Sequence, residues 1–167
     1  MASRRTSEAF LLEGRFSLRQ DEQNYSGRLS WRHAADGDEL LLASPFGQGI
    51  AEISARPGQA ALTTGDGQTF TAPDVPSLTE RALGYRLPLQ RLADWVRGRA
   101  ADAEIAARDA RGRPLRLRHE DWRIEYGYEG DDPLALPASV FAERSGTFEL
   151  RLRIDGWGDL PPGEDAP

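Results

Sequence analysis

Apolar and polar side chains alternate with a period of two along much of this chain, and that pattern restricts its fold more than any other feature. Residues 10–18 and 25–31 show the alternation most clearly. Such a period is typical of a strand with one face in a core and the other in solvent. The connection between the two segments, residues 20–23, is short and polar, so they are predicted to pair as a hairpin.

More strands are predicted along the rest of the chain, either from the same period or from short apolar runs between turn residues. They fall at residues 40–43, 50–55, 60–64, 68–71, 104–108, 115–119, 122–128, 139–143 and 148–154. With the first two they make roughly ten or eleven strands. A sheet of that size with one apolar face must curl and cover that face.

Two short amphipathic helices are predicted in the middle of the chain. Asp74 is placed to cap the first helix, which Gly84 ends. The second begins at Pro88 and closes at Gly98, with apolar residues at i, i+3, i+4 and i+7 counted from Leu89. The predicted fold class is therefore mainly β, an unclosed antiparallel barrel covered by a lid of short helices.

The sequence carries no motif for catalysis or metal binding. A net charge of −6 argues against nucleic-acid binding, and the absence of cysteine excludes thiolate chemistry. His33 and His119 stand at strand ends without ligand spacing and are predicted to be exposed. The acidic residues Glu129, Asp131 and Asp132 are predicted to form a solvated turn. We expect a binding protein with no metal and no cofactor, not an enzyme.

The chain divides by composition into three parts. Residues 1–9 are expected to be flexible, residues 10–157 to form one domain, and residues 158–167 to form a disordered acidic, Pro-rich tail. No stretch reaches the ~20 continuous apolar residues of a membrane-spanning helix. The start, Met-Ala-Ser, is also what remains when a leader has been replaced for expression.

A series of motifs runs through the chain in a fixed order. They are EGRF at residues 13–16, SGRLSW at 26–31, LLLASPFG at 40–47, LPLQRLADWVRG at 87–98, WRIEY at 122–126 and the segment 150–157. This series resembles the LolB family of outer-membrane lipoprotein receptors of Gram-negative bacteria. The likeness extends from Phe10 to about Trp157 and includes Pro137.

The resemblance implies an apolar interior that takes up the acyl chains of lipoproteins handed over by a periplasmic LolA-like carrier. It implies insertion of those lipoproteins into the inner leaflet of the outer membrane. It also implies a location at the periplasmic face of that membrane, through a lipid-bearing N-terminal cysteine that this sequence lacks. A protruding apolar residue in the SPFG turn is characteristic of LolB, so Phe46 is the expected membrane-insertion residue.

The lipid-binding cavity is predicted from the shared phase of apolar residues on the strands and helices. Its expected lining is Leu29, Trp31, Leu42, Ile53, Leu78, Leu83, Leu92, Val96, Ile124, Tyr126, Leu150 and Leu152.

Three alternatives remain open at this point. A LolA-like soluble periplasmic carrier would share the fold. An enzyme acting on a lipid or cell-wall substrate would assemble its carboxylates and histidines from distant positions. A purely structural domain would have a filled core beneath the helices. The expected state is a monomer.

Overall fold

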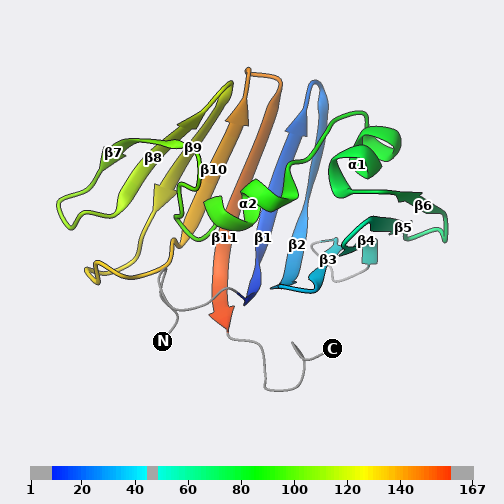
Figure 1. Ribbon diagram of the computed structural model, residues 1–167, viewed down its shortest axis with the longest axis horizontal. Helices are drawn as coiled ribbons and strands as arrows, with labels where there is room; N and C mark the ends of the chain where they lie inside the picture. Colours follow the sequence, from blue (N-terminus) through cyan, green and yellow to red (C-terminus); the bar gives the residue numbers. More distant parts are fainter. Residues whose placement is uncertain (1–8, 45–48, 159–167) are drawn as a thin grey trace.

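The computed structural model describes residues 9–44 and 49–158, apart from the side chain of Leu83. The described residues form one sheet and two helices, and the helices stand between the sixth and seventh strands in the chain (Figure 1). In chain order the elements are β1 (Phe10–Gln20), β2 (Gln23–Ala34), β3 (Gly37–Ala43), β4 (Gly49–Arg56), β5 (Gln59–Thr64), β6 (Thr69–Ala72), α1 (Val75–Leu83), α2 (Leu89–Trp95), β7 (Glu104–Arg108), β8 (Pro114–His119), β9 (Trp122–Gly127), β10 (Ser139–Arg144) and β11 (Phe148–Gly158).

The sheet is antiparallel throughout and does not close. Its strand order is β6-β5-β4-β3-β2-β1-β11-β10-β9-β8-β7, so the first and last strands of the chain pair at its centre. The edge strands β6 and β7 stand at opposite sides of the molecule (Figure 1). The predicted unclosed antiparallel barrel with two helices is therefore confirmed, with eleven strands in the described part of the chain.

One glycine shows how tightly the sheet curls between β2 and β3. A Cβ atom placed at Gly27 would lie 1.9 Å from the carbonyl oxygen of Ala43 on the neighbouring strand. Only glycine permits so close an approach of one backbone to another. The predicted phase of β2 is confirmed beyond this point, because Gly27, Leu29 and Trp31 are all buried, whereas Tyr25 is exposed.

Helix α1 forms where the sequence predicts it, and hydrogen bonds define both its ends. The Asp74 carboxylate accepts a hydrogen bond of 2.8 Å from the backbone N–H of Ser77. At the other end Gly84 has φ 88° and donates its N–H to the carbonyl of Glu80 at 3.0 Å. The Arg81 guanidinium also donates to the carbonyl of Thr71, which joins α1 to the chain just beside it in β6. Helix α1 is thus anchored at the β5–β6 edge of the sheet.

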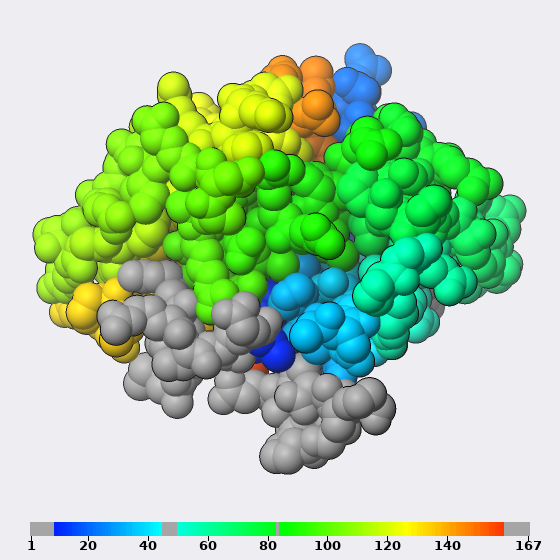
Figure 2. All heavy atoms as spheres, in the orientation of Figure 1, coloured from blue at the N-terminus to red at the C-terminus, as the bar shows by residue number. Residues whose placement is uncertain are grey.

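Helix α2 is shorter and has weaker ends. Pro88 occupies its N-cap position and makes no side-chain hydrogen bond to the helix. The helix ends at Trp95, and Val96 to Gly98 form the turn that follows. Helix α2 crosses the middle of the sheet in front of β1 and β11 (Figure 1). In the space-filling view, α1, α2 and the residues after them largely hide the central strands (Figure 2).

The sequence predicts a flexible N-terminal segment, a disordered C-terminal tail and no membrane-spanning helix. Apart from Ala9 and Gly158, the segments 1–9 and 158–167 lie outside the described residues, and Gly158 is the last residue of β11. Neither α1 nor α2, the helices in the part of the chain that the structure describes, has the length and hydropathy of a membrane span.

Candidate binding site

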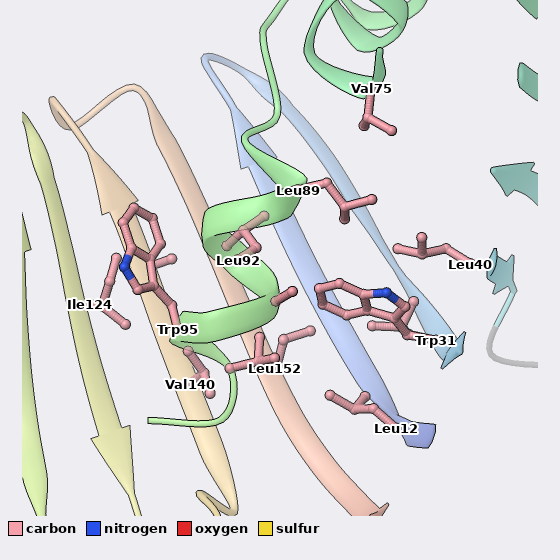
Figure 3. Close-up of a cluster of buried hydrophobic side chains, with 14 of the residues drawn as sticks. Leu12, Trp31, Leu40, Val75, Leu89, Leu92, Trp95, Ile124, Val140 and Leu152 are labelled. Carbon is pink, nitrogen blue, oxygen red and sulfur yellow. The ribbon is translucent and has the colours of Figure 1, made fainter. Parts of the chain in front are cut away.

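An apolar layer fills the space between the concave face of the sheet and α2. Strands on both sides of the sheet centre contribute to it, as do both helices (Figure 3). Leu12, Trp31 and Leu40 come from one side, and Ile124 and Val140 from the other. The alternation of strand side chains produces this layer, because every second residue of a strand faces the same way.

Most of the predicted cavity residues meet in this layer. Buried in one cluster are nine of them, Leu29, Trp31, Ile53, Leu78, Leu92, Val96, Ile124, Tyr126 and Leu152. Leu42 and Leu150 are partly buried and pack against the same cluster. The side chain of Leu83 lies outside the described residues. The periodicity of the sequence therefore identified residues that are buried in the same interior. Whether they bind lipid is a separate question.

Helix α2 fills this interior with its own side chains. Leu89, Leu92, Ala93 and Trp95 are buried, and Trp95 has no exposed surface. In Figure 3 Leu89 and Leu92 lie along α2 among the labelled residues of the layer, and the ring of Trp95 lies beside Ile124. The apolar space beneath α2 is therefore occupied by the helix itself.

Polar contacts hold mainly the C-terminal end of α2. The buried Tyr126 hydroxyl donates a hydrogen bond to the Trp95 carbonyl, from the floor of the sheet to the helix end. Just beyond the helix, the buried Arg97 guanidinium donates to the Ala93 carbonyl at 2.8 Å and lies over the ring of Phe10 at 5.1 Å. A hydrogen bond to a buried carbonyl contributes about 1 kcal/mol net, and more is lost when the carbonyl is left alone.

The two histidines are not exposed, which corrects the expectation from the sequence. His33 stacks on Phe10 at 5.0 Å, and its Nδ1 lies 2.6 Å from the carboxylate of Asp38. The same carboxylate accepts the indole N–H of Trp31 at 2.8 Å. The His119 side chain is 13% exposed. Both rings turn inward because they share the phase of a buried residue two positions earlier in the same strand, Trp31 in β2 and Leu117 in β8. The prediction judged the histidines only by their place near the end of the strand pattern.

One hollow in the described part of the chain lies outside the apolar layer, and another opens beside it, against the buried Trp122 and Phe148 of that layer. One of about 620 Å³ is on the outer face of the sheet, where Glu13, Arg15, Arg28 and Asp155 line it beside Leu41. Another of about 210 Å³ lies between the residues after α1 and the hairpin ends, beside Tyr85. Burial, and secondarily the charge of Tyr25, raise the pKa of Tyr85 to about 12. The first hollow is charged and open, so its chemistry does not suit an acyl chain.

The sequence also singled out an acidic cluster and Phe46, and the structure describes the first but not the second. No group of three histidine or acidic residues that could hold a metal occurs in the described ranges 9–44 and 49–158. Glu129, Asp131 and Asp132 are exposed, as the sequence predicts. Phe46 lies outside the described residues. The strands beside its segment carry two large apolar side chains in solvent, Leu41 at 48% and Ile50 at 41% exposure.

Several interior residues were missed by the sequence prediction of the site. They are Leu12, Leu40, Leu62, Leu89, Trp95, Leu117 and Val140. Leu89 belongs to the same helical stripe that predicted Leu92, so the sequence did contain its signal. Trp95 stands three residues after Leu92 and shares its face for the same reason.

Comparison with known proteins assigns a family to this architecture. The family model of the outer membrane lipoprotein LolB matches residues 8–157. The outer-membrane lipoprotein LolB of Dechloromonas aromatica is 40% identical over 157 residues, which are 91% of this chain and 83% of the relative. The LolB of Klebsiella pneumoniae subsp. pneumoniae is 32% identical over 159 residues, 92% of this chain and 78% of the relative.

Solved structures agree on the fold. A LolA superfamily protein from Nitrosomonas europaea superposes with a TM-score of 0.52 at 11% identity, over 95% of this chain and 90% of that one. A putative outer membrane lipoprotein-sorting protein domain from Vibrio parahaemolyticus gives a TM-score of 0.52 at 10% identity. Identities this low show the LolA-like fold alone.

The family decides between alternatives that geometry leaves open. A filled interior would fit a purely structural domain, and the fold alone would fit a LolA-like carrier. The sequence match over residues 8–157 is to LolB, which confirms the resemblance drawn from the motifs and sets both alternatives and the enzyme aside. The chain therefore belongs to the LolB family of outer-membrane lipoproteins, non-enzymatic receptors that insert lipoproteins into the outer membrane.

Proposed function

We propose that the apolar layer beneath α2 is where this receptor takes up the acyl chains of a lipoprotein, and that α2 moves away from the sheet as they bind. One observation carries the proposal: α2 rests on the sheet through apolar side chains, and no side chain caps its N-terminus. Helix α1, by contrast, has hydrogen bonds at both ends. Of the two helices, α2 is thus the one whose contacts with the sheet an apolar ligand can replace with the smaller loss of free energy.

The energetics of the exchange favour a lipid. An acyl chain that leaves water contributes about 0.8 kcal/mol for each buried methylene. The contacts that it replaces, those of Leu89 and Leu92 with the sheet, are of the same apolar kind. Displaced side chains of α2 can in turn cover the bound chains, so little apolar surface has to return to water. The proposed lining consists of the predicted cavity residues, Leu83 included, together with Leu89 and Trp95.

The family handles lipoproteins together with LolA, and the finer steps are part of this proposal. We infer that a monomer of this chain receives its cargo by direct contact with a LolA-like carrier, without nucleotide or metal. Transfer then runs toward the tighter apolar site. Reconstituted transfer between the two purified proteins tests this step, and a requirement for ATP would contradict it.

Delivery to the membrane is assigned to Phe46. Pro45 and Gly47 favour a reversal of the chain around it, which directs the side chain outward. The exposed Leu41 and Ile50 on the adjoining strands β3 and β4 add apolar surface close to that segment. Apolar side chains gathered on a surface are typical of a contact with a membrane or an apolar partner.

Quenching of tryptophan fluorescence tests the proposed site for acyl chains. Three of the four tryptophans, Trp31, Trp95 and Trp122, are buried in the layer. A triacylated peptide with brominated acyl chains should bind saturably and quench their emission, whereas its unbrominated twin should bind equally without quenching. Saturable binding without quenching would place the chains elsewhere, and no saturable binding would refute the function.

The variant Phe46→Glu tests delivery, with Phe46→Leu as its apolar control. Phe46→Glu should melt as the wild type does and accept lipoprotein from the carrier, yet fail to insert it into liposomes. Phe46→Leu should insert at close to the normal rate. If Phe46 instead packs in the core, both variants should lose stability, because removing a buried Phe costs ~3–5 kcal/mol. That result, or normal insertion by Phe46→Glu, would contradict the assignment.

A further inference from the structure

Two buried nitrogen atoms beneath the C-terminal end of α2 have no hydrogen-bond partner among the residues that the structure describes. They are Nε1 of Trp95 and Nε2 of His119. The two rings lie 6.0 Å apart between centroids, and Trp122 lies 5.6 Å from Trp95. Both nitrogen atoms therefore lie in an aromatic corner of the apolar layer, where α2 covers the ends of β8 and β9.

The other polar groups of this interior are satisfied, which makes the corner unusual. Trp31 donates its indole N–H to Asp38 at 2.8 Å, and Trp157 donates its own to the Pro137 carbonyl at 2.9 Å. The Tyr126 hydroxyl donates to the Trp95 carbonyl. The remaining orphaned side-chain atoms belong to Gln20, Asp36 and Arg123, which stand at strand ends or on the outer face. A buried N–H without a partner is unfavourable and calls for an explanation.

Neighbouring carboxylates do not satisfy His119. Its Nδ1 lies 3.8 Å from Asp102, and its Nε2 lies 3.9 Å from Glu120, both beyond hydrogen-bond distance. Trp95 has a donor only, and the histidine can carry its proton on Nε2 as a second donor. The corner thus offers up to two N–H donors, with the carboxylates of Asp102 and Glu120 close to the histidine, where they would repel an anion. That set suits a neutral acceptor, such as a carbonyl oxygen, better than an ion.

We propose that Trp95 Nε1 and His119 Nε2 bind an ester carbonyl oxygen of the lipid-bearing end of the lipoprotein. This inference depends on the proposed function. Ester and amide carbonyls join the acyl chains to the glyceryl and amino groups of that end, so they are carried inward with the first methylenes. A carbonyl held in the corner would fix how deep the acyl chains reach. Because Trp95 belongs to α2, the same contact would couple the binding of the lipoprotein to the position of the helix.

Two matched ligands separate the carbonyl contact from the burial of acyl chains. One is a triacylated peptide with two ester linkages and one amide, and the other is its analogue of equal chain length and equal charge, in which ether linkages replace the esters and the amide is kept. The wild type should prefer the first ligand about three- to tenfold, the effect of one net hydrogen bond. Trp95→Phe and His119→Phe should each reduce that preference, since both keep an aromatic ring and remove the nitrogen.

Trp157→Phe is the control, because its indole N–H is already paired with Pro137 and it should keep the wild-type preference. Thermal melts of all variants show whether the ring substitutions disturb folding. Equal affinity of the wild type for both ligands, or an unchanged preference in both Trp95→Phe and His119→Phe, would overturn the inference and leave acyl binding intact. An equal drop in the affinity of the variants for both ligands would show that Trp95 and His119 contribute only packing, and would overturn the inference as well. Failure of the wild type to bind either ligand would refute the proposed function itself.

Discussion

The two helices occupy the same side of the sheet and are held there by different forces. Helix α1 has a side-chain N-cap from Asp74, a left-handed C-cap at Gly84 and a hydrogen bond from Arg81 to Thr71. The buried Thr79 hydroxyl accepts the N–H of Leu87, which fixes the chain after the helix as well. These are directional contacts, and a lipid cannot replace them.

Helix α2 has few contacts of that kind. Its N-terminal end follows Pro88 without a side-chain cap, and Leu89 and Leu92 hold it by apolar contact. Polar contacts gather at its other end, through Tyr126 and Arg97. From this contrast we infer that α1 is a fixed part of the wall, whereas α2 moves as a flap whose pivot lies at residues 95–98. The predicted lid of two helices is in this account a lid of one.

The largest expected effect comes from the fixed helix. Leu78 of α1 has no exposed surface, so Leu78→Ala should lower the free energy of unfolding by about 2–5 kcal/mol. The loss should be the same with and without bound lipopeptide, because α1 does not move. Chemical denaturation in both states measures it. A loss that disappears in the loaded protein would break the distinction between the helices.

Leu92→Ala in α2 should behave differently. The substitution should cost stability toward the lower end of the same range, about 2 kcal/mol, because the short helix can settle into the space. It should also tighten the binding of a triacylated peptide, since the closed state that competes with the ligand is weakened. Titration of the peptide by fluorescence measures this. Weaker binding would show that α2 acts as part of the rigid wall.

Tyr126→Phe tests whether the hydrogen bond at the C-terminal end of α2 controls its opening. It removes the hydroxyl that binds the Trp95 carbonyl, and the expected loss of stability is about 1 kcal/mol. Helix α2 should then open more easily, so uptake of a fluorescent lipopeptide should be faster. Tyr128→Phe is a matched control, because Tyr128 donates to the Pro114 carbonyl at a distance from α2. Equal rates in both variants would contradict the role of the pivot.

The smallest expected effect concerns the cap of α1. The backbone N–H of Ser77 holds the pKa of Asp74 below its ordinary value, so the carboxylate stabilises the fold at neutral pH. This contribution is complete above the unfolded pKa of about 4 and is lost as the pH falls through the folded pKa. Asp74→Ala should therefore lower the Tm slightly at pH 7 and less at pH 3. The Tm difference between Asp74→Asn, which caps without titrating, and Asp74→Ala should depend little on pH.

Much of the apolar layer could be predicted from the sequence, because the period of the apolar residues determines which side chains are buried. Alternation along β2 placed Leu29 and Trp31 correctly, and helical spacing placed Leu78 and Leu92. These are local patterns, and one face of each element must be buried. The same reasoning placed the ends of α1, since Asp74 and Gly84 are residues with a specific conformational preference.

Other features depend on contacts between distant segments and had no local signal. The tie between Tyr126 and the Trp95 carbonyl joins residues 31 positions apart. The burial of His33 and His119 depends on Phe10 and on Trp95, which the fold brings beside them. From the sequence alone, a residue near the end of a strand is predicted to be exposed, because its neighbours in space are not known. The unequal anchoring of the two helices could not be predicted for the same reason.

A change in the distance between α2 and the sheet would show whether α2 opens for acyl chains. The chain has no cysteine, so spin labels can be attached at Gln90→Cys on α2 and Arg153→Cys on the outer face of β11, both exposed positions. A second pair, at Arg28 and Arg153, reports on the sheet alone. A triacylated peptide should lengthen the first distance and leave the second unchanged. A saturated protein in which the Gln90–Arg153 distance stays as it is in the free state would contradict this prediction.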